Sequence, residues 1–303
     1  MMSRSRLGLS MAGKDASLTL QHVRLPSKND LVQQHREPTS CSRRQQRVAA
    51  DNDKCDVGVN MLTTVVPVHH TPLNMVKSFL LIGERVVIVD AGMRGGADRI
   101  VSALQRSGRS PADVSLIVIT HSHPDHASDA APLKRLVGTP IAMNFAELKY
   151  VDGSERCPST PASLAGRLFL KTPLPHSKFE SFRPDLDINR EFDLKPYGVE
   201  ATVLPTGGHT PGHLAVYVPS TGELLAIDLL AGGLGIGGIA FHGRPAWPPF
   251  HEDKAQVFAS LNTLLKLPGL RKLHVCHGGP LQPEAVSRWI ARMDRSGAAS
   301  VNR

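Results

Sequence analysis

Short blocks of apolar and β-branched residues recur along the chain from about residue 61 and predict a mixed α/β domain. Blocks of this length, bounded by Gly, Pro, Asn or Asp, are typical of β-strands. They predict strands at Leu62–Val68, Lys77–Ile82, Val86–Val89, Leu116–Ile119, Pro140–Met143, Val199–Leu204, Leu214–Val218, Glu223–Ile227 and Lys272–Cys276.

Between these blocks, apolar residues recur every three to four positions, which is the spacing of one helix face. This spacing predicts helices at Ala97–Gln105, Ala127–Leu136, Phe145–Val151, Ser163–Leu170, Asp253–Leu265 and Pro283–Met293. Strands alternate with helices, and hairpin-like pairs of strands also occur. We therefore expect helices that cover β-sheets from the outside.

The first 60 residues differ from the rest, because they are mostly polar and show little periodicity. Such composition is typical of segments that do not fold on their own. We predict a flexible N-terminal extension at 1–60, with a transit peptide as the alternative, and one folded domain at 61–303.

Composition and charge narrow the class of protein. Apolar residues make up 41% of the chain, which is enough for a sizeable core, and no apolar run approaches the roughly 20 residues that span a bilayer. The net charge of +8 is not clustered, so we expect no nucleic-acid partner and no membrane partner. The four cysteines form no CxxC pair, which favours a reduced, cytoplasmic setting.

The run His121-Ser122-His123-Pro124-Asp125-His126 follows the buried strand predicted at Leu116–Ile119. Imidazole is a good zinc ligand, and a carboxylate completes a second, harder site. One histidine on a loop usually faces solvent, but four potential ligands within one short run predict a metal centre.

Three more potential ligands, His209, Asp228 and His277, each lie at or just past the end of a predicted strand. Strand ends can bring side chains from distant segments into one cleft. We therefore expect these residues to join the histidine-rich run.

These residues, with Asp90-Ala91-Gly92, occur in the order of the metallo-β-lactamase superfamily, which the chain resembles from about Leu62 to Met293. The resemblance implies a four-layer αββα sandwich that binds two zinc ions, with iron or manganese as alternatives. It implies that His121, His123 and His209 bind the first metal, that Asp125, His126 and His277 bind the second, that Asp228 bridges both, and that Asp90 and His213 are structural.

The same resemblance implies a hydrolase in which hydroxide held between the metals attacks a carbonyl, with Asp125 orienting it and moving its proton. His123 stands where the di-iron branch has Glu, which argues against that branch. Asp228 stands where zinc β-lactamases usually have Cys or Ser, which favours the hydrolase branches with a bridging aspartate. A short tail after His277 lacks the helical domain of glyoxalase II, which argues against a glutathione thioester as the substrate. Ala231 replaces a Tyr that is usual in acyl-homoserine lactonases, which weakens the case for a lactonase.

We therefore predict a hydrolase of an ester, lactone or thioester bond in a small molecule. Three alternatives stay open: a weak zinc β-lactam hydrolase, a mono-iron persulfide dioxygenase, and a non-catalytic metal-binding module. A homodimer also stays open.

Loops usually carry specificity, so we expect the substrate pocket to be formed by Pro67–Met75, Asp152–Arg183 and Gly232–His251. The last of these contains candidate substrate-binding residues, namely Phe241, His242, Trp247 and Phe250. They could line an apolar acyl pocket or pack the loop against the domain.

Overall fold

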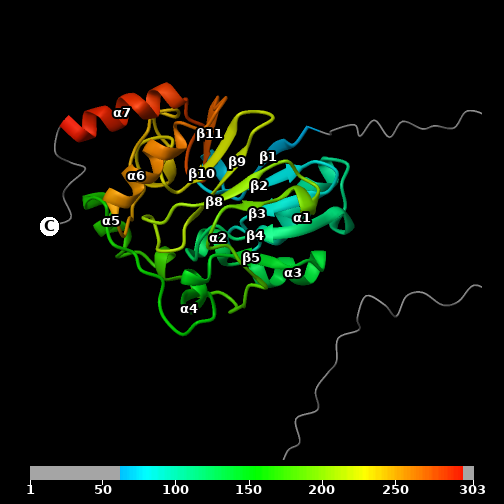
Figure 1. Ribbon diagram of the computed structural model, residues 1–303. Coiled ribbons are helices and arrows are strands. Elements are labelled where there is room, and N and C mark those ends of the chain that lie inside the picture. The colour runs from blue at the N-terminus through cyan, green and yellow to red at the C-terminus, as the bar shows by residue number, and fades with distance from the viewer. Residues whose placement is uncertain (1–61, 296–303) are drawn as a thin grey trace, which may run out of the picture. The chain divides into compact units, whose positions relative to one another are not determined.

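Two β-sheets face each other in the computed structural model, which describes residues 62–295 (Figure 1). The predicted extension at 1–60 lies outside the described residues. The first sheet has the order β1-β2-β3-β4-β5-β6, with β1–β3 antiparallel and β3–β6 parallel. Its strands are β1 (Thr64–His69), β2 (Lys77–Ile82), β3 (Val86–Val89), β4 (Val114–Val118), β5 (Ile141–Met143) and β6 (Leu186–Asp187).

The second sheet has the order β11-β10-β9-β8-β7 and is antiparallel except for the parallel pair β10 and β11. Its strands are β7 (Phe192–Asp193), β8 (Thr202–Pro205), β9 (Leu214–Val218), β10 (Glu223–Ile227) and β11 (Lys272–Val275). The strands β8, β10 and β11 run in the same direction, so their carboxyl ends lie at one edge of this sheet.

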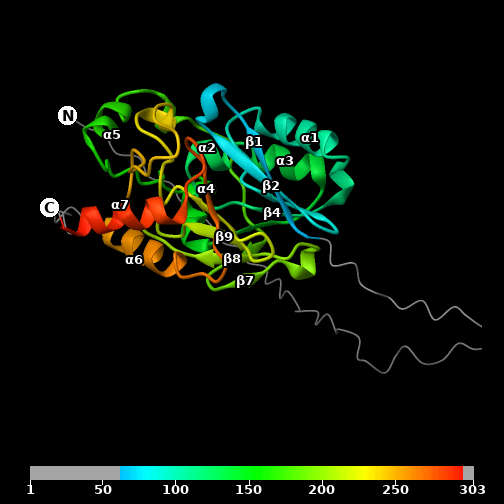
Figure 2. The ribbon, with the colours of Figure 1, turned by 90° about the horizontal axis from the view of Figure 1, so that it is seen from above.

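Helices cover the outer faces of both sheets (Figure 2). The helices α1 (Gly96–Arg106) and α3 (Ala130–Val137) pack on the first sheet, whereas α6 (Lys254–Leu264) and α7 (Pro283–Arg295) pack on the second. The shorter helices are α2 (Pro124–Ala127), α4 (Leu148–Val151) and α5 (Leu164–Phe169), with 3₁₀ turns at Pro72–Asn74, Pro111–Asp113, Phe145–Glu147, Leu174–His176, Lys195–Tyr197 and Ile236–Gly238. Among residues 62–295, no helix is long and apolar enough to cross a membrane.

Alternation of side chains along the strands explains the layers, because successive residues point to opposite faces of a sheet. In β10, Leu225 and Ile227 pack between the sheets, whereas Leu224 and Ala226 pack against α6 and α7. Strand β3 divides its four apolar residues in the same way between the central layer and α1. Three apolar clusters thus lie between the four layers of an αββα sandwich, which confirms the predicted fold class.

The structure differs from the predicted elements mainly in one helix and two short strands. The helix predicted at Ala127–Leu136 is divided into α2 and α3, and Asp129 between them accepts a hydrogen bond from the backbone of Ala97 at 3.0 Å. That bond ties the start of α3 to α1. The two-residue strands β6 and β7 were not predicted, because so short a run carries no periodicity.

Candidate metal centre

Four buried side chains form the first ligand cluster, with one ligand atom from each lying within 4.8 Å of the others: His121, His123, His209 and Asp228. His123 Nδ1 lies 3.1 Å from His121 Nε2 and 3.0 Å from His209 Nε2. Three ring nitrogens thus converge on one point, although His209 is far from the other two histidines in the sequence. This is the geometry expected of histidines that share one cation.

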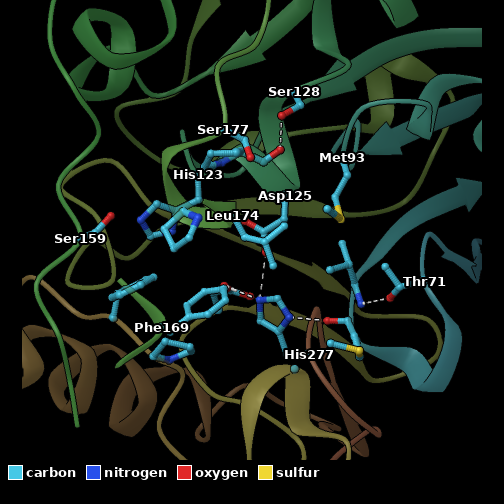
Figure 3. A pocket seen from close by; sticks show the side chains of 18 of the residues that line it. Thr71, Met93, His123, Asp125, Ser128, Ser159, Phe169, Leu174, Ser177 and His277 are labelled. Atoms are coloured by element: carbon cyan, nitrogen blue, oxygen red, sulfur yellow. Dashed lines mark hydrogen bonds and ion pairs between the residues drawn. The ribbon is translucent and has the colours of Figure 1, made fainter. Parts of the chain in front are cut away.

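The second cluster lies next to the first and consists of Asp125, His126, Cys276 and His277, again with ligand atoms within 4.8 Å of one another. Asp125 Oδ2 lies 3.3 Å from His277 Nε2, and the two side chains point toward each other in Figure 3. His126 Nε2 is fully buried and has no hydrogen-bond partner among the described residues. A buried nitrogen is costly to leave without a partner, so a cation fits this position.

Asp228 stands between the two clusters. Its Oδ2 lies 3.5 Å from His209 Nε2, 3.5 Å from His126 Nε2 and 3.1 Å from His277 Nε2. Its Oδ1 is buried and has no hydrogen-bond partner within residues 62–295. One carboxylate therefore reaches ligands of both clusters, as the bridging position requires.

In four of these histidines, the ring nitrogen that faces away from the cluster contacts a polar atom of its own. His121 Nδ1 contacts Thr120 Oγ1 at 3.1 Å, and His209 Nδ1 donates to the carbonyl of Phe250 at 3.1 Å. His123 Nε2 contacts the carbonyl of Pro158, and His277 Nδ1 that of Met75. Such outer partners fix the tautomer and the ring orientation of metal-binding histidines. The donor set and its supports thus fit two divalent cations.

Burial and neighbouring charges shift the pKa values of histidines in both clusters. Burial lowers the pKa of His121 and His209 well below the usual value, which keeps these imidazoles neutral and able to bind a metal. Burial also acts on His277, but Asp228 and Cys276 outweigh it and raise the pKa of His277 well above its usual value. His123 of the first cluster is shifted in the same direction as His277, because Cys157 and Asp125 outweigh burial and raise its pKa to about 9.

Asp90 supports the second cluster from beneath. Its carboxylate accepts hydrogen bonds from the backbone N–H of Thr120 at 2.8 Å and from the hydroxyl of Thr120, and lies 2.7 Å from His126 Nδ1. Asp90 itself has a positive φ of 67°, which is unusual for a residue other than glycine. The Asp90 carboxylate thus orients the ring of His126.

His213 is also structural in this arrangement. Its Nδ1 lies 2.8 Å from the hydroxyl of Thr206, and its Nε2 accepts a hydrogen bond of 3.4 Å from the backbone N–H of Asp228. The imidazole is completely buried and belongs to neither ligand cluster. It therefore positions the backbone that carries the Asp228 carboxylate.

Glu147 connects two ligand loops, and no sequence motif pointed to it. Its buried carboxylate accepts hydrogen bonds from the backbone N–H of Ser122 at 3.1 Å, from the Ser122 hydroxyl, and from the backbone N–H of Gly212 at 2.6 Å. Ser122 lies between two ligands, and Gly212 follows His209. Glu147 thus holds the loops of the first cluster together.

A cavity of about 740 Å³ opens over both clusters and includes His123, Asp125 and His277 in its lining (Figure 3). Most of its remaining wall is apolar and comes from Met75, Val76, Met93, Phe169, Leu174, Pro175, Pro249 and Phe250. All three segments that were expected to form the pocket contribute to it. Met93 lies outside those segments, in the turn after β3.

Only Phe250 of the four candidate substrate-binding residues lines this cavity. Trp247 packs instead against Phe258 and Trp289, with ring centroids 5.1 and 4.8 Å away, which is the packing alternative left open for this loop. Neither Phe241 nor His242 is part of the lining, and Phe241 is 64% exposed. The loop turns these side chains outward, and Phe241 has a positive φ of 54° there.

Comparison with known families identifies the part of the chain that holds both clusters. The model of the metallo-β-lactamase superfamily matches residues 71–277, a range that contains every ligand candidate. A probable metallo-hydrolase of Methanocaldococcus jannaschii is 27% identical over 207 residues, which cover 67% of this chain and 87% of that protein.

Other relatives have named activities. A hydroxyacylglutathione hydrolase of Dechloromonas aromatica is 30% identical over 64% of this chain, but the match spans only 54% of that enzyme. An N-acyl homoserine lactonase of a Bacillus species is 31% identical over 43% of this chain and 44% of that enzyme. Among solved structures, a metallo-β-lactamase family protein of Thermus thermophilus is similar with a TM-score of 0.54, 25% identity and coverage of 77% of this chain and 79% of that one.

Proposed function

The chain belongs to the metallo-β-lactamase superfamily, and on that premise we propose that it is a binuclear zinc hydrolase of a small molecule with an ester, lactone or thioester bond. The observation that carries this proposal is the position of Asp228, whose carboxylate lies within 3.5 Å of ligands of both clusters. Such a carboxylate suits two cations better than one.

Zinc bound in the two clusters would supply Lewis acidity, which polarises a carbonyl and lowers the pKa of water to about 7. The residues of the protein position the reacting groups. Asp125 lies at the cavity wall, with its side chain 28% exposed and its Oδ2 3.3 Å from His277 Nε2. From there its carboxylate can orient the attacking water and take its proton, so Asp125 is the catalytic residue in this proposal.

The cavity wall supports an apolar acyl group as part of the substrate. Met75, Met93 and Phe250 surround the space next to the ligands, and methionine side chains adapt to irregular apolar partners. The hydrolase and lactonase names of the relatives above support an acyl compound in the same way. A carbonyl placed over the metals would have its apolar tail against this wall.

The test combines metal analysis of the purified full-length protein with turnover of lactones, thioesters, carboxyl esters and β-lactams. We expect two zinc equivalents and hydrolysis of lactones, thioesters or esters, faster with longer acyl chains. Preference for β-lactams would contradict the proposed ester, lactone or thioester substrate and would favour a β-lactam hydrolase. One iron with oxygen consumption would contradict the proposal in favour of a dioxygenase, and metal binding without turnover of any compound would favour a binding module.

A further inference from the structure

The thiol of Cys276 lies in the second ligand cluster, and none of the roles above uses it. Cys276 directly follows strand β11, is fully buried, and places its Sγ within 4.8 Å of the ligand atoms of Asp125, His126 and His277. Metal–ligand bonds are about 2.0–2.3 Å long, so atoms this close can surround one ion after small side-chain movements. The thiol thus sits where a ligand would sit.

A buried ammonium group belongs to the surroundings of this thiol. Lys77 is buried at the start of β2, and its Nζ donates a hydrogen bond to the carbonyl of Gly278. Gly278 follows Cys276 by two residues, so this hydrogen bond holds the segment that carries the thiol and His277.

Two buried atoms without partners point to a cation at the same place. His126 Nε2 and Asp228 Oδ1 are both buried and lack a hydrogen-bond partner in the described part of the chain. His126 belongs to the cluster of Cys276, and Asp228 Oδ2 lies 3.5 Å from His126 Nε2. A metal at the second site would satisfy both atoms, and it would lie within reach of the thiol.

We propose that Cys276 is a ligand of the second metal and makes that site thiophilic, in contrast to the first site of imidazoles and one carboxylate. This inference rests on the proposed metal centre. On binding, the thiol releases its proton to solvent as the sulfur–metal bond forms. Thiolate ligands select zinc and other soft ions, whereas carboxylates suit magnesium and manganese. The second site should therefore reject manganese more strongly than its carboxylates alone predict.

Cobalt(II) substitution of the full-length protein tests this proposal, because a thiolate bound to cobalt gives a sulfur-to-metal charge-transfer band in the near ultraviolet. We expect the band with two cobalt equivalents in the unchanged protein and its loss in Cys276→Ser. The control is Cys157→Ser, because the Cys157 thiol lies near the first cluster but contacts Ser122 Oγ at 3.0 Å. This variant should retain the band.

The possible outcomes distinguish a failure of the Cys276 ligand role from a failure of the proposed metal centre. Two bound cobalt ions without the band, or a band that persists in Cys276→Ser, would overturn the ligand role of Cys276 and leave the proposed hydrolase intact. Absence of any bound cobalt would overturn the metal centre and the ligand role together. A second readout uses cadmium against manganese in competition for the protein: the preference for cadmium should fall in Cys276→Ser and stay unchanged in Cys157→Ser.

Discussion

The metal-binding edge and the cavity wall are neighbours, yet they are built in opposite ways. The ligands follow the ends of β4, β8, β10 and β11, and apart from Asp125 they are almost completely buried. The wall comes from loops and short helices, and it includes Leu174, which is 54% exposed. The difference suggests that the sheets determine the chemistry, whereas the loops determine which substrate reaches it.

Replacement of Asp228 by Ala should have the largest effect, because one side chain serves both clusters. We expect activity to fall by more than about 10³-fold, beyond the range typical for the loss of a single electrostatic group. Metal content and turnover should fall together. Asp294→Ala, on the exposed face of α7, is the control. Retention of two metals and of activity in Asp228→Ala would refute the bridging role.

Replacement of Asp125 by Asn separates catalysis from folding on the same edge. The amide keeps the size of the side chain but cannot take a proton, so kcat should fall by roughly 10²–10⁴-fold with little change in thermal stability. Metal content must be measured alongside, because Asp125 is also a ligand candidate. Near-normal turnover by Asp125→Asn would exclude its role as a proton acceptor.

The convergence of the candidate ligands was predictable from the sequence for a local reason. His121, His123 and His126 follow a run of apolar residues, and the same arrangement places Asp228 and His277 after strands. The strands of a sheet share an edge, so residues after them meet whatever the length of the connecting segments. The layers were predictable in part, because the resemblance implied them and the strand pattern agreed.

The cavity wall and the supports of the ligands were not predictable in this way. Glu147 looks like any polar residue of a short helix, and only the fold brings it to Ser122 and Gly212. Trp247 and Phe250 are close together in one loop, yet Trp247 packs against α7 and Phe250 faces the cavity. The outcome depends on a loop conformation with irregular φ values, for which hydrophobic periodicity gives no signal.

Replacement of Glu147 by Gln tests whether the loops of the first cluster need the hydrogen bonds of Glu147, which lies outside the sheets. The amide offers one acceptor oxygen, whereas the two carboxylate oxygens together accept the hydrogen bonds of Ser122 and Gly212. Metal affinity should therefore fall by roughly 10–100-fold, as for other outer partners of ligands. Titration against a chelator measures it.

The matched control for Glu147→Gln is Asp113→Asn. Asp113 also accepts from the backbone N–H and the hydroxyl of one serine, Ser110, but on the exposed surface at a 3₁₀ turn. Equal metal affinities in the two variants would show that the ligand loops hold their positions without Glu147.

The smallest effect on chemistry should come from the wall, where Phe250→Ala and Trp247→Ala form a matched pair. Phe250 lines the cavity, so its loss should raise KM severalfold for long acyl substrates and leave kcat for short ones nearly unchanged. Trp247 is half-buried against Phe258 and Trp289, so its loss should cost about 1–3 kcal/mol of stability without changing the dependence of KM on chain length. Chain-length series and thermal unfolding measure the two effects. If Trp247→Ala changed the chain-length dependence more than Phe250→Ala did, the division between packing and substrate binding in this loop would be wrong.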